Sequence, residues 1–134
     1  LEELFGELRR LGMPAITYMP PRNTAEQMAR IAALAAEYGL LEVSGVDINT
    51  PRQVFNCEEL QRPELSHLNV ATWAMVAHEQ LADVDPSRGL FAVDGPLISL
   101  PLVDRVARYR ELGQALVDGE LTLDQAVVAL KEDT

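Results

Sequence analysis

Two polar residues with metal-binding chemistry directly follow a short apolar run of this sequence. Asp47 and Asn49 come just after residues 40–44, which read Leu-Leu-Glu-Val-Ser and are closed by a glycine. A carboxylate beyond a strand end commonly binds a metal, a sugar hydroxyl or a phosphate-bound cation. Asp47 could instead cap its own loop through an Asx turn, which is the more common role of a loop aspartate at such a spacing.

Two arginines occupy comparable positions and have the chemistry to bind an anion. Arg22 and Arg52 each follow a proline in a loop after a predicted strand. Two guanidinium groups converging there would suit a phosphate or a carboxylate. The alternative is that both are surface arginines paired with nearby acids, since 21 acidic residues face 11 basic ones. The sequence leaves both alternatives open.

A strand–helix–strand unit would bring these loops together. Residues 15–19 and 40–44 have the apolar, β-branched character of short strands, and residues 25–38 have the length and composition of a helix. Thr24 and Gln27 form a capping-box pattern at the start of that helix, with Asn23 as the alternative cap. Strands joined by a helix are parallel, so both loops should leave the same edge of the sheet, where ligands of α/β proteins bind.

The rest of the chain is predicted to be helical. An amphipathic helix over residues 1–11 should end at Gly12, and a long helix should run from residue 64 or 66 to about 81 around Trp73. A third, from residue 99 or 100 to 117, and a fourth, from 122 to 130, predict an αα-hairpin. Two strands make a poor sheet alone, so we expect a partner strand, a helical cover or the rest of a barrel.

Composition and net charge restrict the classes of binding partner that this chain could have. The 134-residue chain has a net charge of -10 and a pI near 4.5, which argues against a nucleic acid or an anionic membrane as its main partner. It lacks an apolar run of roughly 18 residues, as a membrane span would require. A single cysteine, Cys57, excludes an intrachain disulfide and fits a cytoplasmic protein. The chain opens at Leu1 in a helix, which predicts a fragment of a longer protein.

The remaining titratable candidates favour structural roles. His67 and His78 are eleven residues apart on one helix, roughly 16 Å along its axis, so they cannot share one metal ion. Cys57 has no histidine pattern beside it, and Glu42 is expected to be solvated.

Several motifs resemble one family. The segments 18–24 (Tyr-Met-Pro-Pro-Arg-Asn-Thr), 44–53 (Ser-Gly-Val-Asp-Ile-Asn-Thr-Pro-Arg-Gln) and 71–79 look like the late part of certain bacterial PHP-domain proteins. These are metal-dependent phosphoesterase-like enzymes on a distorted (βα)7 TIM-like barrel. The resemblance implies an α/β, helix-rich barrel fragment with two short parallel strands, followed by C-terminal helices. Residues 1–82 would be the last βα units, and 83–134 a turn-rich connection and helical hairpin.

The resemblance also implies a site. Asp47 matches the aspartate ligand of the family's glycine-serine-aspartate-x-histidine motif, while Asn49 stands where the ligand histidine is expected. The intact parent would bind divalent zinc, manganese or iron and hydrolyse a small phosphorylated molecule, with substrate contacts from Arg22, Asn23 and Arg52. This chain holds at most one of several metal ligands and should be inactive alone. The alternative function is a non-catalytic helical interaction module, including a homo-oligomer.

Overall fold

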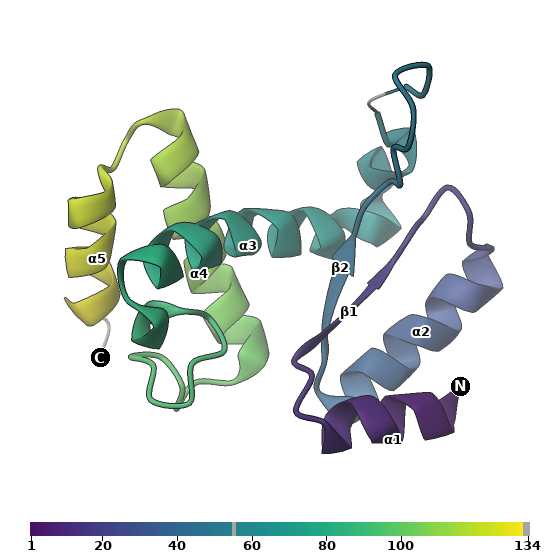
Figure 1. Cartoon of the computed structure of the whole chain (residues 1–134), viewed down its shortest axis with the longest axis horizontal. Coiled ribbons are helices and arrows are strands. Elements are labelled where there is room, and N and C mark those ends of the chain that lie inside the picture. Colours follow the sequence, from purple (N-terminus) through teal and green to yellow (C-terminus); the bar gives the residue numbers. More distant parts are fainter. Residues whose placement is uncertain (55, 133–134) are drawn as a thin grey trace. The chain divides into compact units, whose positions relative to one another are not determined.

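The protein is a helix-rich α/β chain with two short parallel strands (Figure 1). The computed structural model describes residues 1–54 and 56–132. The chain forms two compact units, Leu1–Asn69 and Val70–Thr134. Their boundary lies inside a helix. This boundary separates two groups of closely packed residues, whereas the division predicted between residues 82 and 83 concerned the end of a barrel fragment. None of the described helices is long and apolar enough to cross a membrane.

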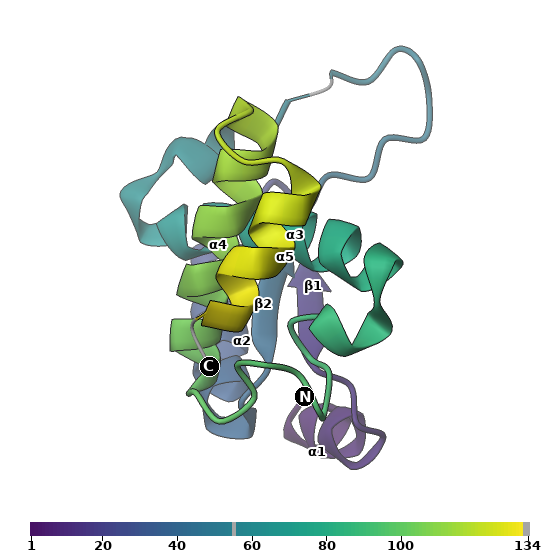
Figure 2. The same cartoon turned by 90° about the vertical axis from the view of Figure 1, so that its left-hand side faces the viewer.

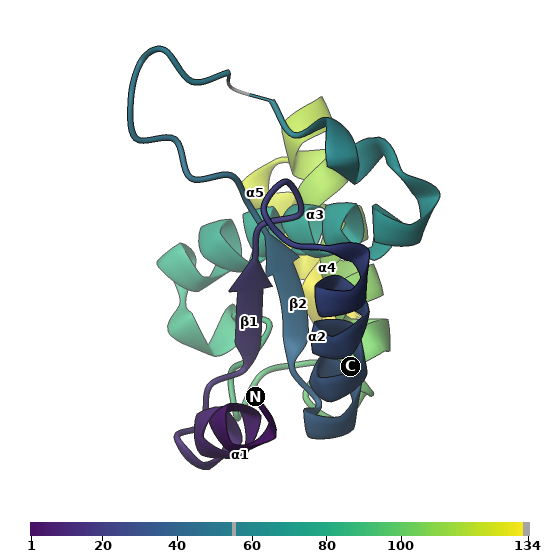
Figure 3. The ribbon, with the colours of Figure 1, turned by 90° about the vertical axis from the view of Figure 1, so that its right-hand side faces the viewer.

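The first unit is built on the predicted strand–helix–strand motif. Its elements are α1 (Glu2–Arg10), β1 (Ala15–Tyr18), α2 (Ala25–Tyr38) and β2 (Leu41–Ser44). The two strands pair in parallel, with Ala15 opposite Leu41 and Tyr18 opposite Ser44. Figure 3 shows both strands running in the same direction, away from α1. The parallel pairing places the loops after β1 and β2 at one edge, as predicted.

Local signals fix the ends of α2. The Thr24 hydroxyl accepts a hydrogen bond from the Gln27 backbone N–H at 3.2 Å, and the Gln27 side chain accepts one from the Thr24 N–H at 2.9 Å. The predicted capping box is therefore confirmed. Asn23 does not cap the helix, and its side-chain oxygen accepts the Met19 N–H at 3.2 Å. At the other end Gly39 has a φ of 66°, the left-handed conformation that glycine adopts without strain.

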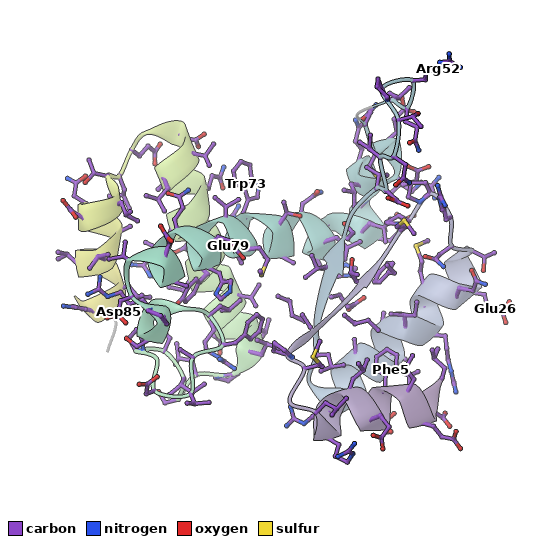
Figure 4. All side chains as sticks on the ribbon, in the orientation of Figure 1. Phe5, Glu26, Arg52, Trp73, Glu79 and Asp85 are labelled. Carbon is purple, nitrogen blue, oxygen red and sulfur yellow. The ribbon has the colours of Figure 1, made fainter. Side chains whose placement is uncertain are left out.

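The core of the first unit lies between the helices and the strands. Phe5 of α1 is fully buried against Leu34, Ala35 and Leu40, as Figure 4 shows where it labels Phe5 between α1 and α2. A second cluster centres on Tyr18 and also contains Leu65, Leu68 and the partly buried Met28, Ile31 and Leu60. After β2 and its loop, one 3-10 helix spans Glu58–Gln61 and another, Pro63–Leu65, precedes α3 (Ser66–Val84).

The second unit is helical. After a 3-10 turn at Pro86–Arg88 come α4 (Leu102–Asp118) and α5 (Leu123–Glu132), which lie side by side as the predicted αα-hairpin (Figure 2). α4 begins later than expected, because Pro101 disfavours helical geometry at Leu100. A second capping box, Thr122 with Gln125, starts α5 as predicted.

Small residues set the packing of α3 against α4. On α3 the buried positions of this unit are Ala71, Ala74, Ala77 and Leu81, whereas Thr72 is exposed. Opposite them stands Gly113 of α4, where an added Cβ would lie 2.0 Å from the Trp73 carbonyl oxygen. Trp73, around which this helix was predicted, is only partly buried, whereas Tyr109 of α4 is 1% exposed and anchors the core of this unit.

Candidate functional site

A cavity of about 430 Å³ lies at the edge where β1 and β2 end. The loop after β1, the loop after β2 and the segment leading to the first 3-10 helix all line it. Its lining residues are Met19, Pro21, Arg22, Val46, Asp47, Ile48, Gln53, Val54, Asn56, Glu58 and Glu59. The cavity therefore lies where the strand–helix–strand unit was predicted to place a ligand site.

Arg22 and Asp47 are the two predicted site residues that this cavity brings together. Both side chains are exposed and both line its wall. Within residues 1–54 and 56–132, neither the Arg22 guanidinium nor the Asp47 carboxylate has a hydrogen-bond or salt-bridge partner. The alternative role of Asp47, a cap on its own loop, is thus not seen among these residues. Both charged groups are available to a ligand.

Gln53 holds the loop that carries Asp47. Its side-chain oxygen accepts hydrogen bonds from the backbone N–H groups of Asn49 and Thr50, the latter at 2.9 Å. Its side-chain nitrogen donates to the Asp47 carbonyl at 3.1 Å. One amide side chain thus closes residues 47–53 into a turn. Asn49 is exposed and does not line the cavity, so only its backbone has a defined role here.

The other two predicted substrate contacts lie elsewhere. Arg52 is at the tip of the loop, pointing away from the strands in Figure 4, and it does not line the cavity. Asn23 is half-buried and occupied by its bond to the Met19 N–H and a 3.5 Å contact with Gln27. The predicted convergence of two guanidinium groups therefore fails, because the loop after β2 is long enough to carry Arg52 outwards.

The cavity is mainly acidic. Among the described residues, three carboxylates, those of Asp47, Glu58 and Glu59, line it together with one guanidinium, that of Arg22. The three carboxylates are not close enough to act as one ligand set. In the described part of the chain no group of three or more histidine, cysteine, aspartate or glutamate side chains could hold a metal ion. A cation bound here by the described residues would use Asp47 as its single predicted ligand.

A second polar cluster, formed by Tyr18, Glu42 and His67, was not predicted. The Tyr18 hydroxyl donates to a carboxylate oxygen of Glu42 at 2.9 Å. The Nε2 atom of His67 lies 3.3 Å from that same oxygen and 3.5 Å from the Tyr18 hydroxyl. We call these three residues the Tyr18 cluster. Burial, and then the hydrogen bond to Glu42, raise the pKa of Tyr18 well above its ordinary value.

The strand register explains why this cluster was missed. Glu42 was expected to be solvated, yet its side chain is only 17% exposed. It pairs with Ile16, and Tyr18, two residues further along β1, projects from the same face. Residues 24 positions apart in sequence become neighbours only once the register of the two strands is known. His67 comes from the first turn of α3, which no local pattern places beside a strand.

The other titratable candidates have structural roles. His78 accepts the Leu90 backbone N–H on Nδ1 at 3.0 Å, and its ring meets Phe91 edge-on with centroids 5.7 Å apart. Burial raises the pKa of the Cys57 thiol, which favours its unreactive protonated form.

The fold and the cavity place this chain in a broad structural class. It is a helix-rich α/β protein with an acidic cavity at the carboxyl edge of a parallel strand pair. Comparison of the chain with models of protein families, with curated proteins and with solved structures finds no match.

Proposed function

We propose that the cavity at the ends of β1 and β2 binds the phosphoryl group of a small phosphorylated substrate, as one wall of a metal-dependent phosphoesterase of the PHP class. The observation that carries the proposal is that Arg22 and Asp47, from two different loops, line the same cavity with charges that are unpaired within residues 1–54 and 56–132. Arg22 offers a planar fork of donors that matches phosphoryl oxygens. Asp47 offers a hard oxygen ligand to a divalent cation.

The charge balance of the cavity also favours a cation. A phosphoryl group held by Arg22 alone would face the carboxylates of Asp47, Glu58 and Glu59 in the same space. A divalent ion on Asp47 would offset that repulsion, so anion binding should depend on the metal. When bound, zinc, manganese or iron would activate a water molecule for attack on the phosphoester.

The residues present fit this metal only in part. Asp47 is one ligand, and Asn49, which lies outside the cavity, is a poor substitute for a histidine. The remaining ligands would come from the other strands of a (βα)7 barrel, of which residues 1–82 would form the last units. The chain alone is then inactive, and the intact enzyme would be a cytoplasmic protein without a nucleic-acid or membrane partner. The net charge of -10 supports that choice of partners.

Paramagnetic NMR tests the proposal on this chain directly. Mn²⁺ titrated into the ¹⁵N-labelled protein should selectively broaden the amide signals of residues 46–48, since relaxation by the ion falls steeply with distance. In a separate titration with diamagnetic Zn²⁺ in place of Mn²⁺, inorganic phosphate should shift the amide signals around Arg22, and shift them less in the absence of metal. Asp47→Asn should abolish the selective broadening, and Arg22→Gln should abolish the phosphate shifts.

Matched controls are available in the second unit. Asp94→Asn changes an exposed acid outside the cavity and should leave both effects unchanged. Equal broadening in the wild type and in Asp47→Asn would remove Asp47 from the ligand set. Phosphate shifts that survive Arg22→Gln would overturn the anion-binding role.

A second candidate function, self-association of a non-catalytic module, has one observation in its favour. Leu4 and Leu11, one heptad apart along α1 and its C-cap, are 52% and 64% exposed, and Met13 is exposed as well. A second copy of the chain could bury this stripe. Light scattering should then give a dimer that Leu4→Ser with Leu11→Ser dissociates, whereas Val93→Ser, at a residue 89% exposed in a loop, has no effect. A monomeric wild type would refute this alternative.

A further inference from the structure

We propose that the Tyr18 cluster is a three-ligand binding site for a transition-metal ion, Fe³⁺ in particular. This site is distinct from the cavity at the ends of β1 and β2, which we call the Arg22–Asp47 cavity. The three residues come from β1, β2 and the first turn of α3. They all belong to the first compact unit, and none of them lines the Arg22–Asp47 cavity.

The argument begins with the distances between the donor atoms. The Tyr18 hydroxyl oxygen, one Glu42 carboxylate oxygen and His67 Nε2 form a triangle with sides of 2.9, 3.3 and 3.5 Å. The centre of such a triangle lies about 1.9 Å from each corner, so an ion with bonds of about 2.0–2.2 Å would sit just outside its plane. Three ligands on one face of an ion leave its other positions open to water or a ligand.

The chemistry of the donors selects the ion. A phenolate and a carboxylate are hard oxygen ligands, and imidazole nitrogen also binds iron, so the set suits Fe³⁺ better than a soft ion. Binding replaces the proton that Tyr18 now shares with Glu42, and this proton passes to solvent. Burial and Glu42 hold that proton firmly, and a highly charged cation beside the oxygen reverses this preference.

The cluster is held in place and can be reached from solvent. Tyr18 is 6% exposed and packs in a core cluster with Leu65 and Leu68, which fixes its ring. The His67 side chain is 43% exposed, and a cavity of about 230 Å³ reaches both His67 and Tyr18. Arg62 and Glu64 also line this cavity. An ion can therefore enter on the His67 side without unfolding the core.

Absorption spectroscopy gives a readout specific to tyrosine. Fe³⁺, supplied to the intact chain as its nitrilotriacetate complex, should produce the visible charge-transfer band of an iron–phenolate bond. Tyr18→Phe should lose the band completely. Glu42→Gln and His67→Gln should each weaken Fe³⁺ binding by about tenfold or more, because each removes a direct ligand. Far-UV circular dichroism of each variant checks that it is folded.

Two controls separate this site from other groups. Tyr38→Phe removes a hydroxyl outside the cluster and should keep the band. Asp47→Asn should keep it as well, which distinguishes this site from the metal proposed at Asp47. If Tyr18→Phe fails to fold, diamagnetic Ga³⁺ titrated into the wild-type protein should still shift the ring signals of Tyr18 and His67.

Three results would overturn the proposal. These are a folded wild type that shows neither the band nor the Ga³⁺ shifts, a band that persists in folded Tyr18→Phe, and Fe³⁺ affinity that is unchanged in both Glu42→Gln and His67→Gln. In each case the Tyr18 cluster would be a hydrogen-bonded contact without a metal-binding role.

Discussion

Replacing Gly113 by alanine should separate α4 from α3 in the second unit. A Cβ at this position would lie 2.0 Å from the Trp73 carbonyl oxygen and 3.2 Å from the Ala77 backbone nitrogen. Both obstacles are backbone atoms in the middle of a helix, so no side chain can rotate away to make room. The helices must move apart, and the buried contacts around Tyr109 and Leu112 loosen with them.

The expected change in the free energy of unfolding of Gly113→Ala is the balance of two effects. Alanine is the better helix former, which favours the variant by about 1 kcal/mol. Overpacking against an unyielding neighbour typically costs about 1–3 kcal/mol, and a contact more than 1 Å too short belongs at or above the upper end. We therefore expect a net loss of about 2 kcal/mol or more in the free energy of unfolding, which is about 8–16 °C in Tm for a unit of this size.

The single tryptophan provides the assay. Because Trp73 lies in the second unit, its fluorescence during urea unfolding reports on that unit. The midpoint for Gly113→Ala should fall, with the slope against urea unchanged if the folded and unfolded states keep their surface. A serine at the same position should be worse than alanine, because it adds a further atom at the obstructed point.

Gly6→Ala is the matched control. Gly6 also lies inside a helix, but the atom nearest to its added Cβ is 4.0 Å away, on the Tyr38 ring. The helix-propensity gain should therefore survive, and Gly6→Ala should be neutral or stabilise the first unit by up to about 1 kcal/mol. A Gly113→Ala midpoint equal to or above that of the wild type would refute the proposed close packing of α3 and α4.

Two further predictions concern a helix cap and a buried hydroxyl. Thr24→Ala removes the N-cap of α2 and should therefore lower the free energy of unfolding by about 1 kcal/mol. Urea unfolding followed by circular dichroism measures this loss. Thr50→Ala, in an exposed loop, should cost almost nothing, and equal losses in the two variants would contradict the capping role. Burial raises the pKa of Tyr109 from 10.0 to about 12, although Arg105 partly opposes it. The folded state thus favours the neutral phenol, so its stabilising contribution is complete below pH 10 and is lost as the pH rises towards 12. Tyr109→Phe removes the hydrogen bond to the Arg88 carbonyl, which should lower the free energy of unfolding by about 1 kcal/mol. The variant should also lack the alkaline decline in stability. Urea unfolding of both proteins at pH 9 and at pH 11.5 measures the two effects.

Local patterns in the sequence were enough to predict the elements. The strand–helix–strand motif, both capping boxes and the αα-hairpin depend on residues within a few positions of one another, such as Thr24 with Gln27 and Thr122 with Gln125. Propensity and capping act over one helical turn, so they can be recognised without any knowledge of the fold. The late start of α4 could have been predicted by the same reasoning from Pro101.

The common edge for Arg22 and Asp47 could also be predicted, because parallel strands joined by a helix deliver their loops to the same side. The paths of the loops that carry these residues could not be predicted. Arg52 lies at the loop tip and Asn23 is held by the turn after β1, since a loop's course depends on contacts such as those of Gln53 rather than on a repeating pattern.

What only the tertiary structure decided are contacts between residues far apart in the chain. The Tyr18 cluster depends on the register of two strands and on the placement of α3, and each involves residues at least 24 positions apart. The importance of Gly113 likewise appears only when α4 meets α3. Such contacts depend on the packing of the whole unit, because the volumes of its side chains and the distances between its backbone segments are determined together. Composition, charge and local structure were therefore readable from the chain itself, whereas the geometry of its polar clusters was not.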